Sequence, residues 1–140
     1  MTADEVRAFT EQHLRHWQAL DAAAMAADHA ADGVVDSPSA GTHQETEAIR
    51  KALQWWIDSF PDMQITKEQV VADTDAAAIV VTIHGTQQGE FFGVPAAGQH
   101  LVFRMVLMLR FENGLIAHEQ RIYDFSGVLA RLGVIKIRSS

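Results

Sequence analysis

Apolar residues in the N-terminal part of the chain recur every three or four positions, the period of an amphipathic helix. This spacing predicts a first helix over about residues 3–20. A second helix is expected over residues 22–31, where alanine dominates and Asp21 can serve as N-cap. A third helix follows and ends at Pro61. The stripes of the first and third helices are Val6, Phe9, His13, Trp17 and Leu20, and Ile49, Leu53, Trp56, Ile57 and Phe60.

The segment between the second and third helices has a less regular pattern. Val34 to Asp36 is expected to be a short extended piece, and residues 39–42 a loop. Thr42 and Glu45 have the spacing of a capping box at the start of the third helix.

The second half of the chain is rich in β-branched and aromatic residues, which predicts strands over residues 63–71, 77–84, 99–112 and 115–125. Asn113-Gly114 separates the last two, and both residues accept the positive φ that a two-residue hairpin turn requires. Helices come first and strands later, which is typical of an α+β fold with an antiparallel sheet. A length of 140 residues fits one domain, residues 1–140.

The composition excludes several classes of function. There is no cysteine, so disulfides, thiolate nucleophiles and cysteine zinc sites are ruled out. The net charge is −7 with scattered basic residues, which argues against partners such as nucleic acids or anionic membranes. No apolar stretch has the length of a membrane helix, and the charged N-terminus is unlike a signal peptide, so we expect a cytoplasmic protein.

The main candidate for chemistry is Asp124, a carboxylate at the end of the last predicted strand. Period-2 alternation puts Ile122, Gln120 and His118 on the same strand face. A carboxylate in an apolar cavity would have a raised pKa and could act as a general base near neutral pH. The alternative is structural, because Asp124 directly precedes a helix predicted from Ser126 onward and could cap it.

Several polar residues could assist Asp124. Arg104 and Arg110 share one face of a long strand and could bind a carbonyl or carboxylate, or could be solvated surface arginines. His118 could move a proton or donate to an oxyanion, and Gln120 could hold a carbonyl.

The sequence offers little for a metal or a covalent intermediate. His13 and His16 are three residues apart on a helix, but no third ligand has a supporting spacing, so we predict no metal site. No serine lies in a nucleophile-elbow context.

The order of short motifs along the chain resembles that of the SnoaL-like polyketide cyclases, a branch of the nuclear transport factor 2-like superfamily. The motifs are Phe60-Pro61-Asp62, Gly85-Thr86 with Gly89, Gly93 and Pro95, then Gly98, Arg110 with Gly114, and Asp124 with Leu129, Leu132 and Gly133. The resemblance implies a cone in which a curved antiparallel sheet wraps on three helices around an apolar pocket. It also implies intramolecular aldol closure of a polyketide ester, with Asp124 as acid/base, assistance from Arg110, and no cofactor.

The chain departs from the family pattern at several positions of the expected pocket. Gln87 replaces a histidine, Gln120 replaces a tryptophan, Asp36 replaces a residue that is often histidine, and Ala96-Ala97 replaces Pro-Thr. The substrate therefore cannot be transferred from the family. The expected substrate-binding residues are Trp17, Asp36, Trp56, Phe60, Gln87, Phe91, Arg104 and Met108.

Three functions remain open from the sequence. The first is a cyclase acting on a small hydrophobic carbonyl substrate. The second is epoxide hydrolysis or ketone isomerisation in the same pocket, with Asp36 and Asp124 as the two carboxylates of a hydrolase. The third is a ligand-binding module without catalysis. Because the helices are too few to cover both faces of the sheet, we also expect a homodimer or a higher homo-oligomer.

Overall fold

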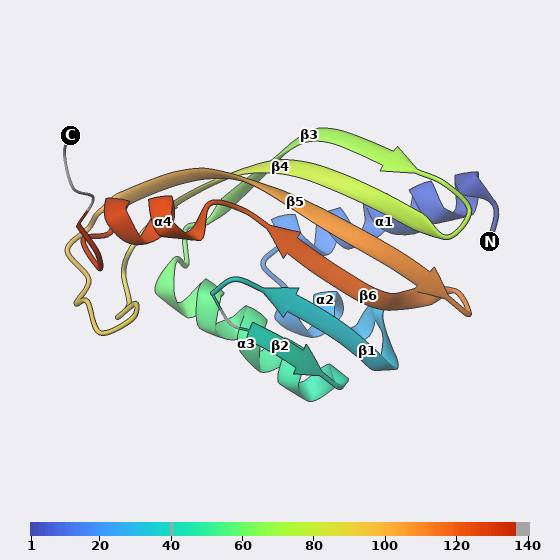
Figure 1. Ribbon diagram of the computed structural model, residues 1–140, viewed down its shortest axis with the longest axis horizontal. Helices are drawn as coiled ribbons and strands as arrows, with labels where there is room; N and C mark the ends of the chain where they lie inside the picture. Colours follow the sequence, from blue (N-terminus) through green and yellow to red (C-terminus); the bar gives the residue numbers. More distant parts are fainter. Residues whose placement is uncertain (40, 137–140) are drawn as a thin grey trace.

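The computed structural model describes residues 1–39 and 41–136. Within them lie four helices, α1 (Ala3–Gln18), α2 (Ala22–Ala27), α3 (Thr46–Ser59) and α4 (Phe125–Arg131). The strands are β1 (His29–Ser37), β2 (Gly41–Gln44), β3 (Gln64–Ala72), β4 (Ala76–Thr86), β5 (His100–Glu112) and β6 (Leu115–Ile122). The predicted α+β class is confirmed (Figure 1).

The strands form one six-stranded sheet in the order β2-β1-β6-β5-β4-β3. Each neighbouring pair is antiparallel except β1 and β6, which run parallel. The sequence predicted an antiparallel sheet of four strands, whereas the sheet has six strands and is mixed. The tight turn between β5 and β6 is as predicted, with φ of 52° at Asn113 and 79° at Gly114.

The extra strands replace two elements that the sequence pattern suggested. The alanine-rich helix ends at Ala27 instead of residue 31, because His29 already begins β1 and the backbone N–H of Ile116 donates to the carbonyl of Asp28 at 3.0 Å. Gly41–Gln44 is a strand paired with β1, and not a loop with a capping box. The N-cap of α3 is Glu45, with a φ of 71° and no side-chain cap hydrogen bond.

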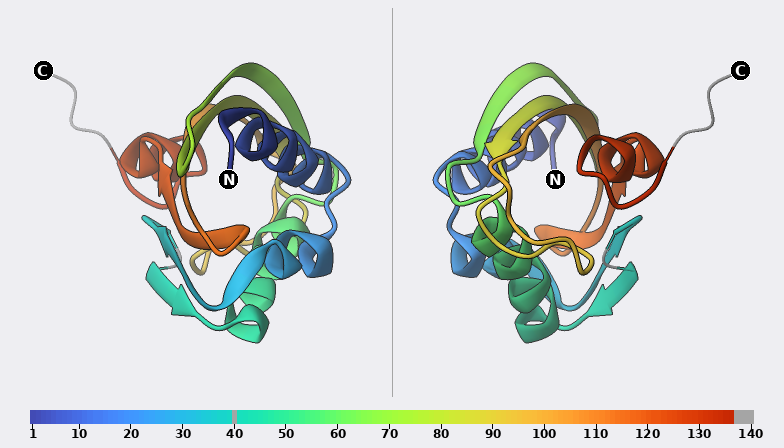
Figure 2. Two further views of the ribbon diagram at one scale, coloured as in Figure 1. Left: turned by 90° about the vertical axis from the view of Figure 1, so that its right-hand side faces the viewer. Right: turned by 90° about the vertical axis from the view of Figure 1, so that its left-hand side faces the viewer.

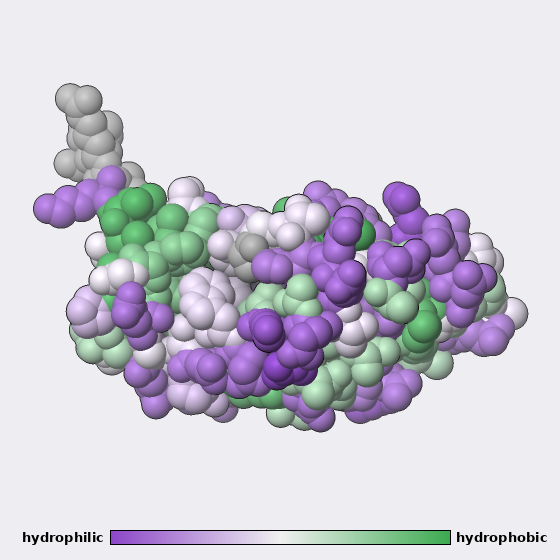
Figure 3. Space-filling model, turned by 90° about the horizontal axis from the view of Figure 1, so that it is seen from below, coloured by the Kyte–Doolittle hydropathy of each residue, from purple (hydrophilic) through white to green (hydrophobic). Residues whose placement is uncertain are grey.

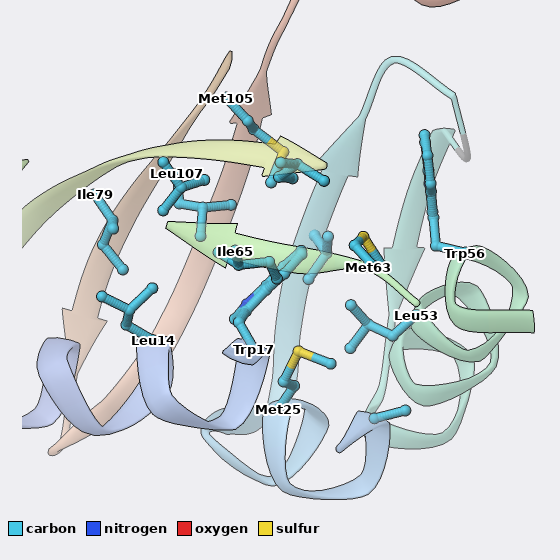
Figure 4. Close-up of a cluster of buried hydrophobic side chains, with 14 of the residues drawn as sticks. Leu14, Trp17, Met25, Leu53, Trp56, Met63, Ile65, Ile79, Met105 and Leu107 are labelled. Carbon is cyan, nitrogen blue, oxygen red and sulfur yellow. The ribbon is translucent and has the colours of Figure 1, made fainter. Parts of the chain in front are cut away.

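The sheet curls around the N-terminal helices, which leaves the molecule with an inner, helix-covered face and an outer face (Figure 2). On β4 the inner side chains are buried and alternate with partly exposed outer ones. The core between the sheet and the helices contains side chains from both, for example Trp17 of α1, Leu53 of α3 and Met105 of β5 (Figure 4).

Two features of the surface bear on function. Among the described residues, no helix is long and apolar enough to cross a membrane. Apolar surface is concentrated at the end of the molecule where α4 and the loop before β5 lie (Figure 3). The exposed large apolar side chains there are Phe92, in that loop, and Ile135, which follows α4.

Candidate active site

A small pocket of about 20 Å³ lies between the sheet and the N-terminal helices. Its wall is mostly apolar and draws on α1, α2, α3 and the inner face of β4 and β5, with Trp17, Met25, Leu53, Met63 and Met105 converging on it (Figure 4). Three polar residues share the lining: Ser37, Arg121 and Tyr123. An apolar cavity with a few convergent polar groups is the usual form of a small-molecule site.

Arg121 is the cationic group of the pocket. It projects from the inner face of β6 and is only 4% exposed. Its Nε and Nη2 both donate to Oε2 of the fully buried Glu119, at 3.1 and 2.9 Å. Its guanidinium carbon lies 5.0 Å from the centre of the Trp17 ring, in cation–π contact. The guanidinium is thus held in one orientation at the cavity wall.

Tyr123 follows Arg121 on the same face and lies just beyond the end of β6. Its ring packs against Phe103, with ring centres 5.3 Å apart, and against Trp56 at 6.2 Å. Its hydroxyl is buried and has no hydrogen-bond partner among the described residues. A buried hydroxyl without a partner is costly, so a ligand oxygen that accepts its hydrogen bond would be stabilised.

Behind Arg121, a buried network of charged groups links α1, the α2–β1 junction and β6. Nδ1 of His13 lies 2.7 Å from Oδ2 of Asp28, and Nε2 of His13 lies 2.7 Å from Oε1 of Glu119. Burial alone lowers the pKa of His13, but the hydrogen bonds and charges of the two carboxylates outweigh it and raise this pKa to about 9. His13 is therefore an imidazolium that donates from both nitrogens.

The protonation of His13 decides whether Nε2 can accept a hydrogen bond from Trp17. Nε1 of Trp17 lies 3.2 Å from Nε2 of His13, which would be a hydrogen bond only if that nitrogen had a free lone pair. Nε2 of His13 therefore donates to Glu119, 2.7 Å away. The Trp17 N–H is then left close to the pocket without a true acceptor.

The carboxylates of the network are ionised. Burial alone would raise the pKa of Glu119, but the charge of Arg121 and the hydrogen bond from His13 hold it well below its usual range. The pKa of Asp28 is also lowered, because hydrogen bonds from His13 and His16 outweigh its burial. Two anions thus face two cations, Arg121 and His13, and the buried charges balance.

The predicted pair His13 and His16 does find a third potential metal ligand, which the sequence reasoning missed. Asp28 accepts from Nδ1 of His16 at 2.7 Å as well as from His13. A second group, His13, His29 and Glu119, also brings its ligand atoms within 4.8 Å of one another. The predicted helix over residues 22–31 hid both groups, because it placed Asp28 and His29 within a helix.

Asp124 does not lie in an apolar cavity. It is the N-cap of α4, is fully exposed, and accepts hydrogen bonds from the backbone N–H of Gly127 and the hydroxyl of Ser126, both at 2.9 Å. These bonds lower its pKa. The expected burial and raised pKa are therefore wrong, and the helix-cap alternative describes its position.

The residues expected to assist Asp124 lie on the outer face of the sheet. Arg110 and Gln120 are exposed, and His118 is half-buried with its Nε2 2.7 Å from Oδ2 of Asp36. Asp36 also accepts from the hydroxyl of Thr42 at 2.6 Å, and the bonds from Thr42 and His118 lower its pKa. As the alternation of side chains predicts, these residues lie on one face of the sheet, but that face is the one opposite to the pocket.

The expected substrate-binding residues divide into three groups. Trp17 and Trp56 line the pocket. Phe60 and Phe91 are fully buried against Trp56, with ring centres 5.7 and 5.1 Å away, but they are outside the lining. The others lie elsewhere: Asp36, Arg104 and Met108 on the outer face, and Gln87 in the loop before β5, where its Nε2 donates to the carbonyls of Gly89 and Val94.

The sequence reasoning missed Arg121 and Tyr123, which line the pocket, and Glu119, which holds Arg121 in place. Glu119, Arg121 and Tyr123 follow one another at every second position, so they share one face of the last strand. A charged side chain on the covered face of a strand is costly unless it is paired or has a function, and this holds for the buried Glu119 and Arg121, whereas Asp124 is exposed.

The fold and pocket define the class of protein. A curved mixed sheet folded over N-terminal helices is the nuclear transport factor 2-like, or ketosteroid-isomerase-like, fold, which solved structures of that description share with this chain. The model of the SnoaL-like polyketide cyclase family matches residues 6–132, so the chain belongs to this family and the predicted resemblance is confirmed. No curated protein matches the sequence closely enough to count as a relative.

Solved structures similar to the chain carry related descriptions. AclR from Streptomyces galilaeus, a candidate hydroxylase, is 25% identical with a TM-score of 0.84, over 99% of this chain and 87% of that one. IdmH from Streptomyces antibioticus, a candidate polyketide cyclase, is 28% identical with a TM-score of 0.70, over 85% and 91%. A candidate SnoaL-like polyketide cyclase from Jannaschia sp. CCS1 is 18% identical with a TM-score of 0.80, over 91% and 92%.

Proposed function

We propose that the chain is an enzyme that closes a ring in a small, hydrophobic, polyketide-like carbonyl compound by acid/base chemistry. Membership of the SnoaL-like family and the similarity to IdmH support the class of substrate. The observation that carries the proposal is that Arg121 and Tyr123 both line the wall of an apolar pocket, and that the Tyr123 hydroxyl has no hydrogen-bond partner among the described residues.

Two donors of this kind suit a carbonyl oxygen. Loss of a proton next to a carbonyl moves negative charge onto that oxygen, and donors fixed in advance stabilise it. Arg121 is fixed by Glu119 and Trp17, so it needs little reorganisation when the charge develops. The enolate carbon then attacks a second carbonyl of the same molecule, whose two ends the pocket holds close together.

The proton acceptor is proposed to be Asp124. No carboxylate is among the residues that line the pocket, and Asp124 is the first acidic residue beyond Tyr123, one position along the chain. Its lowered pKa keeps it ionised at neutral pH, the form a base requires. It would act on a substrate that extends from the pocket to the N-terminus of α4, and it would return the proton to the alkoxide of the new bond.

Replacement of Asp124 by asparagine separates its two roles. Asparagine also caps helices well, so we expect the thermal unfolding temperature to change little, whereas turnover should fall at least 100-fold if Asp124 is the base (about 10²–10⁴ for general-base catalysis). The measurement is product formation by mass spectrometry on a confirmed substrate. Full turnover by Asp124→Asn would reduce Asp124 to a helix cap, and Ser126→Ala is a control that removes one of its hydrogen bonds without touching the carboxylate.

The test of the proposed function is Tyr123→Phe, which removes one hydroxyl and leaves the ring. A naphtholate, the anion of a naphthol, resembles an enolate in shape and charge, and the binding of naphthols can be followed through the fluorescence of Trp17 and Trp56 in the pocket wall. We expect the variant to bind naphthols at least tenfold more weakly than wild type and to unfold at the same or a higher temperature, because the hydroxyl lacks a partner. Equal naphthol binding by both proteins would contradict the proposal.

The alternatives have less support from the geometry. Opening an epoxide in this pocket would use two carboxylates, but Asp36 lies on the outer face, bonded to Thr42 and His118. Isomerisation of an unsaturated ketone would use the same two donors, and it differs in giving a product without a new ring. A pocket that binds naphthols while no carbonyl compound is converted would favour the binding module.

We also propose that the outer face of the sheet pairs with a second copy of the chain. Val80, Val106 and Ile122 are register partners across β4, β5 and β6, and Ile122 is 48% exposed. An apolar row of this kind on an uncovered sheet face suits an isologous interface. Light scattering should give a dimeric mass for the wild type and a monomeric mass for Ile122→Lys, with Thr82→Lys as a matched control on a more polar row. A monomeric wild type would overturn this proposal.

A further inference from the structure

A second feature, separate from the pocket lining, combines two histidines and a carboxylate. His13, His29 and Glu119 are all buried and come from α1, β1 and β6. Oε1 of Glu119 lies 2.7 Å from Nε2 of His13 and 3.6 Å from Nε2 of His29. The second distance is too long for a hydrogen bond but is close to the separation of about 3.4 Å expected between two ligands of one tetrahedral ion.

The remaining polar atoms of these three side chains are fixed by a second set of contacts. Nδ1 of His13 bonds to Asp28 at 2.7 Å, and Nδ1 of His29 bonds to the carbonyl of Met25 at 3.0 Å. The other oxygen of Glu119 accepts both bonds from Arg121. In metal sites, ligating histidines donate their second N–H to carboxylates or carbonyls in this way, which leaves Nε2 to face the ion.

An unused nitrogen points into the group. Nε2 of His29 is fully buried and has no hydrogen-bond partner within the described part of the chain. The carbonyl of Met25 can only accept, so Nδ1 of His29 is the donor of that bond. In the neutral ring Nε2 then carries a lone pair, 3.6 Å from Oε1 of Glu119. By contrast, both histidines of the group His13, His16 and Asp28 already bond to the same carboxylate oxygen, and among the described residues this group has no fully buried polar side-chain atom without a partner.

We propose that His13 Nε2, His29 Nε2 and Glu119 Oε1 bind a divalent transition-metal ion of the Zn²⁺ class. Two imidazoles and one carboxylate suit Zn²⁺, Co²⁺ and Fe²⁺, and not Mg²⁺ or Ca²⁺. Binding replaces the proton on Nε2 of His13, so one proton leaves and the 2.7 Å contact opens to a ligand–ligand separation. The ion would join α1, β1 and β6 and position Glu119, which in turn holds Arg121. This proposal stands independently of the proposed function.

The first experiment uses the intact wild-type chain after removal of metals by a chelator. Zn²⁺ is added while the histidine ring nitrogens are followed by long-range ¹H–¹⁵N NMR. We expect Nε2 of His13 and His29 to shift strongly at one equivalent of Zn²⁺, and the signals of His16 to move far less. Absence of any shift, or shifts confined to His16 and the surface histidines, would overturn the proposal.

The second experiment measures affinity with Zn²⁺ by calorimetry and the coordination with Co²⁺ by visible absorption. His29→Gln should weaken Zn²⁺ binding by about 100-fold or more, because it removes a ligand, and loss of an outer-shell partner alone costs roughly 10–100-fold. His16→Gln is the matched control and should bind as tightly as wild type. If His16→Gln loses binding and His29→Gln keeps it, the ion belongs to the group around Asp28 and the assignment fails.

Discussion

Glu119→Leu is expected to lower the free energy of unfolding by about 3–5 kcal/mol. Glu119 is fully buried and accepts from both Arg121 and His13, so its loss leaves two cations in the interior without their shared anion. Breaking one partner out of a buried ionic network is among the most damaging single substitutions. Urea denaturation in metal-free buffer, followed by tryptophan fluorescence, measures the change.

A second variant tests the explanation for this loss. The double variant Glu119→Leu/Arg121→Met also removes the positive charge that Glu119→Leu leaves buried without its anion. It should therefore be more stable than Glu119→Leu alone. If Glu119→Leu costs less than about 1 kcal/mol, the value of an ordinary surface ion pair, the buried network does not hold these elements together.

Arg121→Lys is expected to reduce turnover by about 10²–10³-fold, the usual effect of losing one donor to a developing oxyanion. Lysine keeps the positive charge beside Glu119 but lacks the planar fork and the stacking on Trp17. The protein should therefore remain folded, which circular dichroism can confirm. Steady-state kinetics on a confirmed substrate should place the loss in kcat more than in KM, because the interaction strengthens as charge develops.

Arg110→Lys provides the matched control. Arg110 lies on β5, is exposed on the outer face, and is the arginine that the family resemblance selects. We expect Arg110→Lys to retain nearly full turnover. The opposite result, with Arg110→Lys inactive and Arg121→Lys active, would move the site to the outer face of the sheet and refute the inner-pocket assignment.

Much of the fold could be predicted from local pattern. The spacing of Val6, His13 and Trp17 predicts α1 and its buried face, and Asn113-Gly114 predicts the turn between β5 and β6. These signals are local, because they depend on residues a few positions apart. Of β1, only residues 34–36 were predicted as extended, because β1 pairs in parallel with β6, a partner far along the chain that no local pattern reveals.

The candidate site was harder to predict because β6 is polar on both faces. His118 and Gln120 occupy one face, and Glu119 and Arg121 the other, so alternation alone does not tell which is covered by helices. The position of Asp124 at the end of the strand and the family resemblance both point to it, whereas the buried carboxylate of the same segment is Glu119. Only the position of α1 over the inner face decides between them.

The network around His13 also has a consequence for how the chain folds. His13 and Glu119 are 106 residues apart in sequence, and β6, which carries Glu119, is the last strand to be synthesised. Contacts of such long range form only after the entropy of closing a large loop has been overcome, which slows folding. A nascent chain that ends before β6 holds His13 and Asp28 without their partner strand. The pocket, whose wall includes Arg121 of β6, is therefore completed last. Until β6 inserts between β1 and β5, the edges of these two strands are exposed and the chain is vulnerable to aggregation.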